Sequence, residues 1–228
     1  MTTIRSAVDL AAAKAIGART EELFRSSGAL REGHFLLKSG RHSERYLEKF
    51  LVLQDPAATS ELCGFWAAAH RDSDGKPIVD VVAGPTTGGV LLAFETARQL
   101  GVRSIFAEEV KTADGTTKRE FRRGFTIAAG ERVLLVDDIL TTGGSLLAML
   151  PAVEGFGGEV ITCAVMADRS GGLASLTSPG TGRSYPLRAL WQLDLPTYEP
   201  GPATCPACAA GVPLHAPGST GAAGPKAG

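Results

Sequence analysis

The chain has 228 residues, of which 44% are hydrophobic and 21% are charged, as is usual for a folded globular protein and not for a disordered one. Its 23 basic and 24 acidic residues give a net charge of −1, which argues against an extended nucleic-acid-binding surface. No apolar run approaches the ~20 residues of a membrane span, and the N-terminus lacks the pattern of a secretory signal. We therefore expect a cytoplasmic protein with neither nucleic acid nor membrane as a partner.

Strands and helices are predicted to alternate along the chain. Apolar residues at helical spacing predict a helix over residues 7–27 that ends at Gly28, and short strand-like pieces flank a basic turn at residues 38–41. Further helices are predicted over residues 59–71, 90–100 and from 146 onward, and strands over 77–84, 103–109, 133–136 and 160–168. This order is typical of a single α/β domain with a parallel sheet, expected here over residues 1–215. Residues 216–228 are mainly Gly, Ala and Pro and are expected to be disordered.

The four cysteines do not form the pattern of a disulfide framework. Cys63 and Cys163 stand in apolar surroundings and are predicted to lie in the core. Cys205 and Cys208, with His215 further on, have half of the spacing of a zinc site, but a structural zinc needs four ligands. We therefore favour two reduced thiols in a C-terminal loop, with a metal site completed by two subunits as the alternative.

The stretch VLLVDDILTTGGSLLAML, residues 133–150, combines a buried strand, a small polar loop and a helix. In an open α/β sheet such a loop lies at the carboxyl end of its strand, where the N-terminus of the next helix attracts anions. Glycines let the backbone approach an anion closely, and hydroxyl groups add donors. The loop therefore predicts a phosphate cradle formed by Thr141, Thr142, Gly143, Gly144 and Ser145.

Asp137 and Asp138 stand directly before this loop. Two carboxylates repel a phosphate unless each faces a donor such as a sugar hydroxyl or a divalent cation. A ribose 5-phosphate group meets both requirements. The stretch lacks the lysine of a G-x-x-x-x-G-K-[ST] loop and the spacing of G-x-G-x-x-G, which disfavours the common nucleotide loops. The alternative is a buried strand followed by a helix that Thr142 or Ser145 caps.

Residues 133–144, VLLVDDILTTGG, resemble the phosphoribosyl pyrophosphate (PRPP) signature of the type I phosphoribosyltransferases. The resemblance implies an open, mostly parallel α/β sheet flanked by helices, with a small hood from the N-terminal segment, about residues 7–53. It also implies that the two acids hold the ribose hydroxyls, that PRPP carries Mg²⁺ without a protein ligand, and that a homodimer shares a mobile loop between its active sites. The residues then expected to bind PRPP are Asp137, Asp138, Ile139, Leu140, Thr141, Thr142, Gly143, Gly144 and Ser145, with Thr87 and Gly88 in an earlier turn.

Two further segments resemble the orotate phosphoribosyltransferases. Residues 33–46, GHFLLKSGRHSERY, resemble a motif whose lysine approaches the orotate site, and Lys38 matches that lysine. Residues 167–172, ADRSGG, resemble a segment whose arginine pairs with the orotate carboxylate, and Arg169 matches that arginine. A guanidinium suits this role because it binds a carboxylate bidentately. The resemblance also implies that Thr141 contacts the base.

The implied reaction transfers the ribose 5-phosphate group of PRPP to orotate, which gives orotidine 5′-monophosphate and pyrophosphate in pyrimidine biosynthesis. The resemblance covers roughly residues 20–215, nearly all of the foldable chain. Two alternatives stay open: a phosphoribosyltransferase for another base, and a PRPP-sensing regulator that binds RNA or DNA without turnover. The basic face that such a regulator needs is not apparent in the composition.

The sequence departs from the family at two places that concern pyrophosphate. Gly88 stands where family members often carry a lysine, and Glu108 and Glu109 stand near the Arg-Lys positions of the mobile loop, which also lacks its histidine. Residues 109–123 are still expected to form a mobile lid, because they are polar and contain an Asp-Gly turn signal. Cations must screen the departing pyrophosphate, and the predicted catalytic cations are Lys111, Lys118 and Arg119. The alternative is a solvated hairpin.

Overall fold

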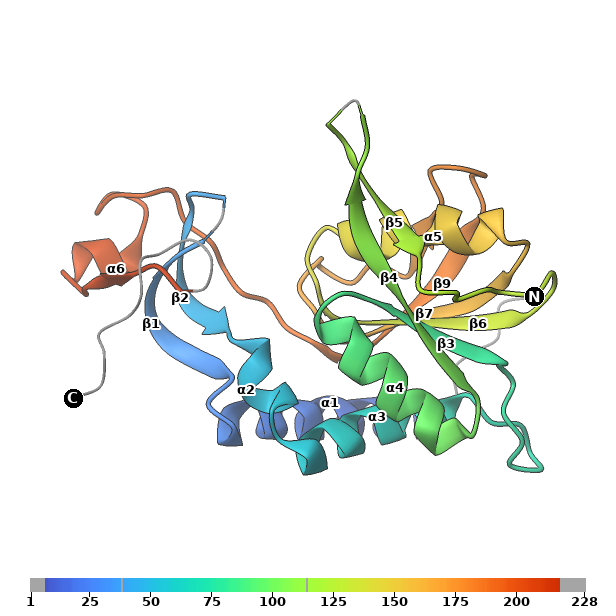
Figure 1. The fold of residues 1–228 in the computed structure, drawn as a ribbon. Coiled ribbons are helices and arrows are strands. Elements are labelled where there is room, and N and C mark those ends of the chain that lie inside the picture. Colours follow the sequence, from blue (N-terminus) through green and yellow to red (C-terminus); the bar gives the residue numbers. More distant parts are fainter. Residues whose placement is uncertain (1–6, 38, 114, 218–228) are drawn as a thin grey trace.

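The computed structural model describes residues 7–37, 39–113 and 115–217. Its main element is a seven-stranded sheet in the order β5-β4-β3-β6-β7-β9-β8 (Figure 1). The five inner strands pair in parallel, and the edge strands β5 and β8 pair antiparallel with their neighbours. The strands are β3 (Val81–Pro85), β4 (Arg103–Lys111), β5 (Thr117–Phe121), β6 (Arg132–Leu140), β7 (Glu159–Asp168), β8 (Ser175–Thr177) and β9 (Ser184–Gln192). The predicted open, mostly parallel sheet is confirmed.

Helices cover both faces of this sheet (Figure 1). α1 (Ala7–Ser26), α3 (Pro56–Ala69) and α4 (Gly88–Leu100) pack on one face, and α5 (Gly144–Gly155) packs on the other. Successive residues of β6 serve the two cores in turn: Leu134 and Val136 point toward α1, α3 and α4, whereas Val133 and Leu135 point toward α5. A strand buried on both faces needs the continuous apolar run that the sequence has here.

A three-stranded sheet forms the hood beside the main sheet (Figure 1). β1 (Leu30–Leu36) and β2 (His42–Leu47) form an antiparallel hairpin, and β10 (Leu214–His215) adds to β1 in parallel. α2 (Lys49–Leu53) leads from the hood to α3, and α6 (Pro206–Ala209) packs against β1. The hood was expected from the N-terminal segment, but the C-terminal segment contributes to it as well. α1 packs instead against β9, where Phe24 lies 5.6 Å from the ring of Trp191.

The segment predicted as a mobile lid, with a solvated hairpin as the alternative, contains a β-hairpin. β4 and β5 pair with Lys111 opposite Thr117 and Glu109 opposite Arg119. Phe121 anchors the end of β5 in the core, whereas the four polar residues before it, 117–120, are exposed or partly exposed. Its mobility stays a prediction. The strand predicted over residues 133–136 also extends further, from Arg132 to Leu140, so both acids of the PRPP motif lie inside β6.

The N-terminal helix and two of the cysteines lie as the sequence predicts. α1 ends at Ser26, and Gly28 follows with a φ of 71°, which is the left-handed conformation that glycine adopts freely. Cys63 and Cys163 are fully buried. Of the tail predicted to be disordered, residues 218–228 lie outside the described residues. In the described part of the chain, no helix has the length and apolar character needed to cross a membrane.

Candidate active site

The loop after β6 encloses a hollow of about 210 Å³. Gly143 has a φ of 78°, and a Cβ added to it would lie 3.0 Å from Cδ2 of Leu176, so the turn requires glycine. The first N–H groups of a helix have no partner within it, so the start of α5 offers donors to an anion. The structure thus brings the predicted PRPP loop together around one hollow, lined by Asp137, Ile139, Leu140, Thr141, Thr142, Gly143, Gly144, Ser145 and Leu146.

Asp137 and Asp138 are buried at the end of β6, with 7% and 5% of their surface exposed. Each acid is oriented by the backbone N–H that follows it: Asp138 N donates to Oδ1 of Asp137 over 2.8 Å, and Ile139 N donates to Oδ1 of Asp138 over 2.7 Å. Burial and the neighbouring Asp138 carboxylate raise the pKa of Asp137. The site therefore holds two buried acids, of which Asp137 has the raised pKa and lines the hollow.

Lys49 is a site residue that the sequence analysis missed. It is the first residue of α2, and its Nζ lies 2.6 Å from Oδ2 of Asp138. The side chain of Lys49 is about one third exposed, so its charge lies between the buried acid and solvent. A single lysine in the run YLEKFLVL carries no motif, which is why only the fold identifies it.

Gly88 lies where the carboxylate of Asp138 approaches the start of α4. A Cβ at this position would lie 2.2 Å from Oδ2 of Asp138 and 3.4 Å from Cδ1 of Leu53. No side chain fits there without displacing the acid. This contact gives a physical reason for the departure from the family lysine, because Lys49 supplies a cation at the same carboxylate. Thr87 caps α4 next to this glycine, and the Thr86–Thr87 peptide is cis.

Arg119 is the predicted hairpin cation that the structure places at the site. Its Nη1 donates to Oγ1 of Thr86 over 3.0 Å, its Nη2 lies 3.4 Å from Glu109, and its side chain is 10% exposed. Lys118 pairs instead with Glu120, with 2.7 Å between Nζ and Oε1. Lys111 lies two residues beyond Glu109 along β4, on the same face as Arg119 but toward the tip of the hairpin. The catalytic roles of these three cations stay predictions.

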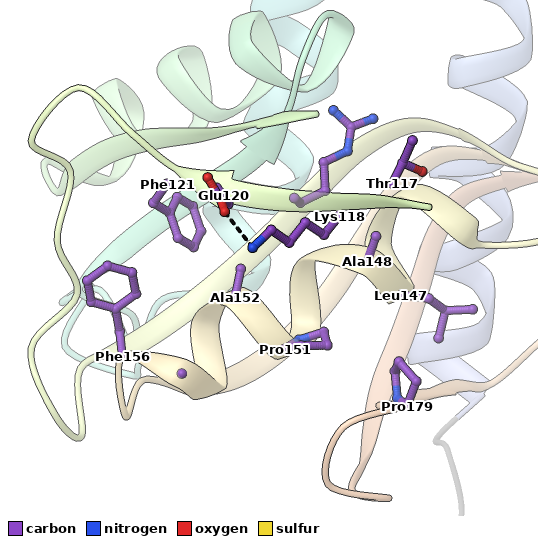
Figure 2. A pocket seen from close by; sticks show the side chains of 12 residues that line it. Thr117, Lys118, Glu120, Phe121, Leu147, Ala148, Pro151, Ala152, Phe156 and Pro179 are labelled. Carbon is purple, nitrogen blue, oxygen red and sulfur yellow. Dashed lines mark ion pairs between the residues drawn. The ribbon is translucent and has the colours of Figure 1, made fainter. Parts of the chain in front are cut away.

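A larger groove of about 740 Å³ lies between β5 and α5 (Figure 2). Its walls are mostly apolar, from Phe121, Leu147, Pro151 and Phe156, and the ion pair of Lys118 with Glu120 runs along its edge (Figure 2). Neither acid nor any of residues 137–146 lines it. The smaller polar hollow, and not this groove, therefore has the chemistry of a phosphate site.

Arg169 follows β7 and lies beside the phosphate loop, since its N–H donates to the carbonyl of Leu140 over 2.8 Å. Among the described residues its Nε is buried and has no hydrogen-bond partner. Burial lowers the pKa of Arg169, and Tyr46 of the hood is close enough to oppose this effect. A buried N–H group without an acceptor is costly unless a ligand supplies one. Lys38, the other predicted orotate residue, lies outside the described residues.

These groups meet at the carboxyl ends of the inner strands of the main sheet. β3, β6 and β7 are parallel neighbours, so the segments that follow them, from Thr86, Thr141 and Arg169, lie side by side. The crevice at the carboxyl ends of the strands is where open α/β sheets bind ligands. The hood faces these strand ends through Lys49 and Tyr46. The arrangement combines a hollow suited to phosphate, a pair of acids and an arginine whose buried Nε has no partner among the described residues.

Comparison with known proteins agrees with this architecture. Residues 53–179 match the family model of the phosphoribosyl transferase domain. The orotate phosphoribosyltransferase of Caldicellulosiruptor saccharolyticus is 44% identical over 198 residues, which cover 87% of this chain and 94% of that protein. The chain therefore belongs to the orotate phosphoribosyltransferase family. The family resemblance found in the sequence motifs is confirmed.

Solved structures with the same fold include enzymes for different bases. Orotate phosphoribosyltransferase from Mycobacterium tuberculosis superposes with a TM-score of 0.57 at 24% identity, over 77% of this chain and 96% of that chain. Adenine phosphoribosyltransferase from Rhodothermus marinus gives the same TM-score at 21% identity, over 77% of this chain and 99% of that chain. Since the fold fits both equally, the fold by itself does not select the base.

Proposed function

We propose that the protein transfers the ribose 5-phosphate group of PRPP to orotate, giving orotidine 5′-monophosphate and pyrophosphate for pyrimidine biosynthesis in the cytoplasm. The observation that carries this proposal is the buried Nε of Arg169, which has no hydrogen-bond partner among the described residues, in a side chain that lies beside the phosphate hollow. Orotate differs from uracil by a carboxylate, and that anion satisfies the arginine. Uracil, hypoxanthine and adenine offer no such group.

The proposed division of labour follows from the charges at the site. The loop from Thr141 to Ser145 holds the 5-phosphate, and Asp137 and Asp138 accept hydrogen bonds from the ribose hydroxyls. Mg²⁺ enters with PRPP as part of the substrate complex, since its oxygen ligands come from the pyrophosphate and the ribose. Pyrophosphate departs as C1′ gains positive charge, so catalysis rests on positioning and on cations near the leaving group. We assign this role to Lys49, which contacts Asp138, and to Arg119, which contacts Thr86.

We further propose a homodimer in which the β4–β5 hairpin reaches the active site of the partner. Leu91 and Phe94 support this proposal, because they lie one turn apart on α4 with 47% and 63% of their surface exposed. Phe94→Glu is expected to shift the protein to monomer in light scattering. A mixed dimer of one chain with Lys111 and Lys118 replaced by Ala and one chain with Asp138→Asn tests the sharing, and Arg119 is left unchanged because it contacts Thr86 of its own chain. A shared hairpin restores one complete site, whereas unshared hairpins leave none.

A base-competition assay tests the reaction. The protein is incubated with PRPP and Mg²⁺, and the absorbance of orotate is followed beside parallel reactions with uracil, hypoxanthine and adenine. We expect turnover with orotate alone and release of pyrophosphate in equal amount. Turnover of adenine or hypoxanthine would assign the protein to another base. PRPP binding without turnover of any base would favour the regulator instead.

A further inference from the structure

Two histidines and two cysteines meet inside the hood. The ligand atoms of His34, His42, Cys205 and Cys208 all lie within 4.8 Å of one another. His34, His42 and Cys205 are buried, with 3%, 6% and 0% of their surface exposed, and Cys208 is half-buried. The sequence predicts the two cysteines in a C-terminal loop, with His215 further along the chain. His215 is not part of this cluster. The structure supplies the missing ligands from the other end of the chain.

The fold brings these residues together through the three strands of the hood. His34 lies on β1 and His42 begins β2, so the antiparallel hairpin places the two rings in edge contact with centroids 4.6 Å apart. Cys205 caps α6 and Cys208 lies in its single turn, which points both thiols toward the hairpin. β10 pairs with β1 immediately after this turn, with Leu214 opposite His34. The four side chains are therefore fixed by backbone pairing on both sides.

The spacing of the four atoms fits one tetrahedral metal ion. Zinc bonds of about 2.3 Å to sulfur and 2.0–2.1 Å to nitrogen place a sulfur and a nitrogen about 3.6 Å apart. Nε2 of His34 lies 3.6 Å from each sulfur, and Nδ1 of His42 lies 3.3 Å from the sulfur of Cys208. The two nitrogens are 2.8 Å apart and must separate slightly to bind a common ion. A Rieske cluster is a poorer fit, because its cysteines and histidines bind different irons.

The surroundings prepare His34 and His42 as ligands. Nδ1 of His34 lies 2.8 Å from the carbonyl oxygen of Val212, so the N–H there donates outward and leaves Nε2 free to bind a metal. The backbone of His42 exchanges two hydrogen bonds with Tyr198, of 2.9 Å and 2.8 Å. The contact with Val212 sets the tautomer of the His34 ring, and the contacts with Tyr198 fix the start of β2, before any ion binds. Such second contacts are typical of metal-binding histidines.

We propose that His34, His42, Cys205 and Cys208 bind one structural Zn²⁺ ion. Two thiolates and two imidazoles are the donor set that zinc prefers, and four protein ligands close the site, so the ion has no open position for catalysis. The site joins the β1–β2 hairpin to the C-terminal segment. It lies outside residues 53–179, which match the family domain, and it does not depend on the proposed reaction.

The metal site also fixes the turn that follows β1. Arg41 in this turn donates to Oγ1 and to the carbonyl of Thr197, over 2.8 Å and 2.7 Å, and pairs with Glu199. The C-terminal segment thus holds the hairpin both through the ligands and through Arg41. Since this hairpin carries Tyr46, which is close to Arg169, loss of zinc is expected to weaken orotate binding more than PRPP binding. This last expectation rests on the proposed function.

Metal analysis of the full-length protein tests the proposal. Protein expressed with zinc in the medium is expected to contain about one zinc per chain. Replacement by Co²⁺ is expected to give visible bands of tetrahedral cobalt and near-ultraviolet bands of thiolate coordination. Cys208→Ser and His42→Asn are expected to lose both signals, whereas the matched control His215→Ala keeps them. A folded wild-type protein that binds neither zinc nor cobalt would overturn the proposal. The cluster would then be a His34–His42 hydrogen bond beside two reduced thiols.

A second measurement separates this proposal from the proposed function. Chelation of the holoprotein is expected to lower its melting temperature, and added zinc is expected to restore it. Orotate and PRPP affinities are then measured with and without metal. Zinc binding in a protein that does not turn over orotate would keep the metal site and reject the reaction. Turnover that is complete in metal-free protein with an unchanged melting temperature would reject the structural zinc alone.

Discussion

Nζ of Lys49 lies 2.6 Å from Oδ2 of Asp138, so a lysine from the border of the hood contacts the second acid of the PRPP motif. The pair links the part of the chain before the family domain to its signature strand. Gly88 makes room for this contact, because a side chain there would overlap the same oxygen. The cation that the family often carries at that position is thus replaced by one from α2.

Lys49→Met is expected to lower kcat/KM for PRPP at least tenfold. A hydrogen bond to a charged group contributes about 1.5–3 kcal/mol, and its loss leaves Asp138 buried without a cation. The matched control is Lys76→Met, since Lys76 is an exposed lysine away from the site. Steady-state kinetics and urea unfolding separate catalysis from stability. Tighter PRPP binding in the variant would show instead that Lys49 blocks the acid.

Gly88→Ala is expected to abolish most PRPP binding. Its Cβ would lie 2.2 Å from Oδ2 of Asp138, so either the carboxylate or the start of α4 must move. Gly155→Ala is the control, because a Cβ at this helical glycine meets nothing within 4 Å. Titration of PRPP by calorimetry provides the comparison. Equal affinities in the two variants would contradict the tight approach of Asp138 to Gly88.

PRPP binding is expected to release a proton from Asp137 below neutral pH. Burial and Asp138 raise the pKa of Asp137 to about 7, and an ionised acid accepts the ribose hydroxyls better than a protonated one. PRPP affinity therefore rises with pH up to this value and then levels off. The stability of the free protein falls as the pH rises from the ordinary pKa of an aspartate to the raised pKa of Asp137. In this range the folded state binds a proton that the unfolded state has lost.

Calorimetry in two buffers of different ionisation enthalpy measures the released proton. Asp137→Asn is expected to remove the release. Asp80→Asn is the control, since Arg132 already lowers the pKa of Asp80 to about 2 and it stays ionised throughout. Proton release that persists in Asp137→Asn would assign the titration to another group.

Arg169→Ala is expected to raise the KM of orotate much more than that of PRPP. A carboxylate that loses its buried partner costs about 2–5 kcal/mol in comparable interfaces. Arg169→Lys should not rescue the affinity, because lysine lacks the bidentate geometry of a guanidinium. The control is Arg183→Ala, an exposed arginine in the loop before β9. Similar changes in both KM values would remove Arg169 from the base site.

Replacing Lys111, Lys118 and Arg119 together by Ala is expected to lower kcat by orders of magnitude while orotate binding stays nearly intact. Arg119→Ala alone should account for more of the loss than Lys118→Ala, because Arg119 contacts Thr86 whereas Lys118 pairs with Glu120. Arg122→Ala is the matched control, because it removes a cation that lies directly after β5. Protection of residues 109–120 from proteolysis by PRPP and Mg²⁺ checks closure. A near-normal kcat in the triple variant would reject the hairpin as the lid.

The contiguous part of the site was predictable because its chemistry is local. The acids, the phosphate loop and the helix that follows occupy residues 133–150, so their order along the chain already sets their arrangement in space. The same holds for the α/β fold, since apolar runs of strand length alternate with helical segments. Arg169 was matched through the resemblance of ADRSGG to a family segment, and the structure places it directly after β7, the parallel neighbour of β6.

The long-range contacts were decided only by the tertiary structure. Lys49 stands alone in its segment, and its approach to Asp138 depends on how α2 packs against α1, α3 and α4. The β4–β5 hairpin places Arg119 at Thr86 through cross-strand pairing that a polar sequence does not reveal. His34 and Cys205 are 171 residues apart, and the sequence showed only half of their site. Spacing along a chain predicts a site when its residues share one segment, whereas ligands from opposite ends meet only after strands pair and the core closes.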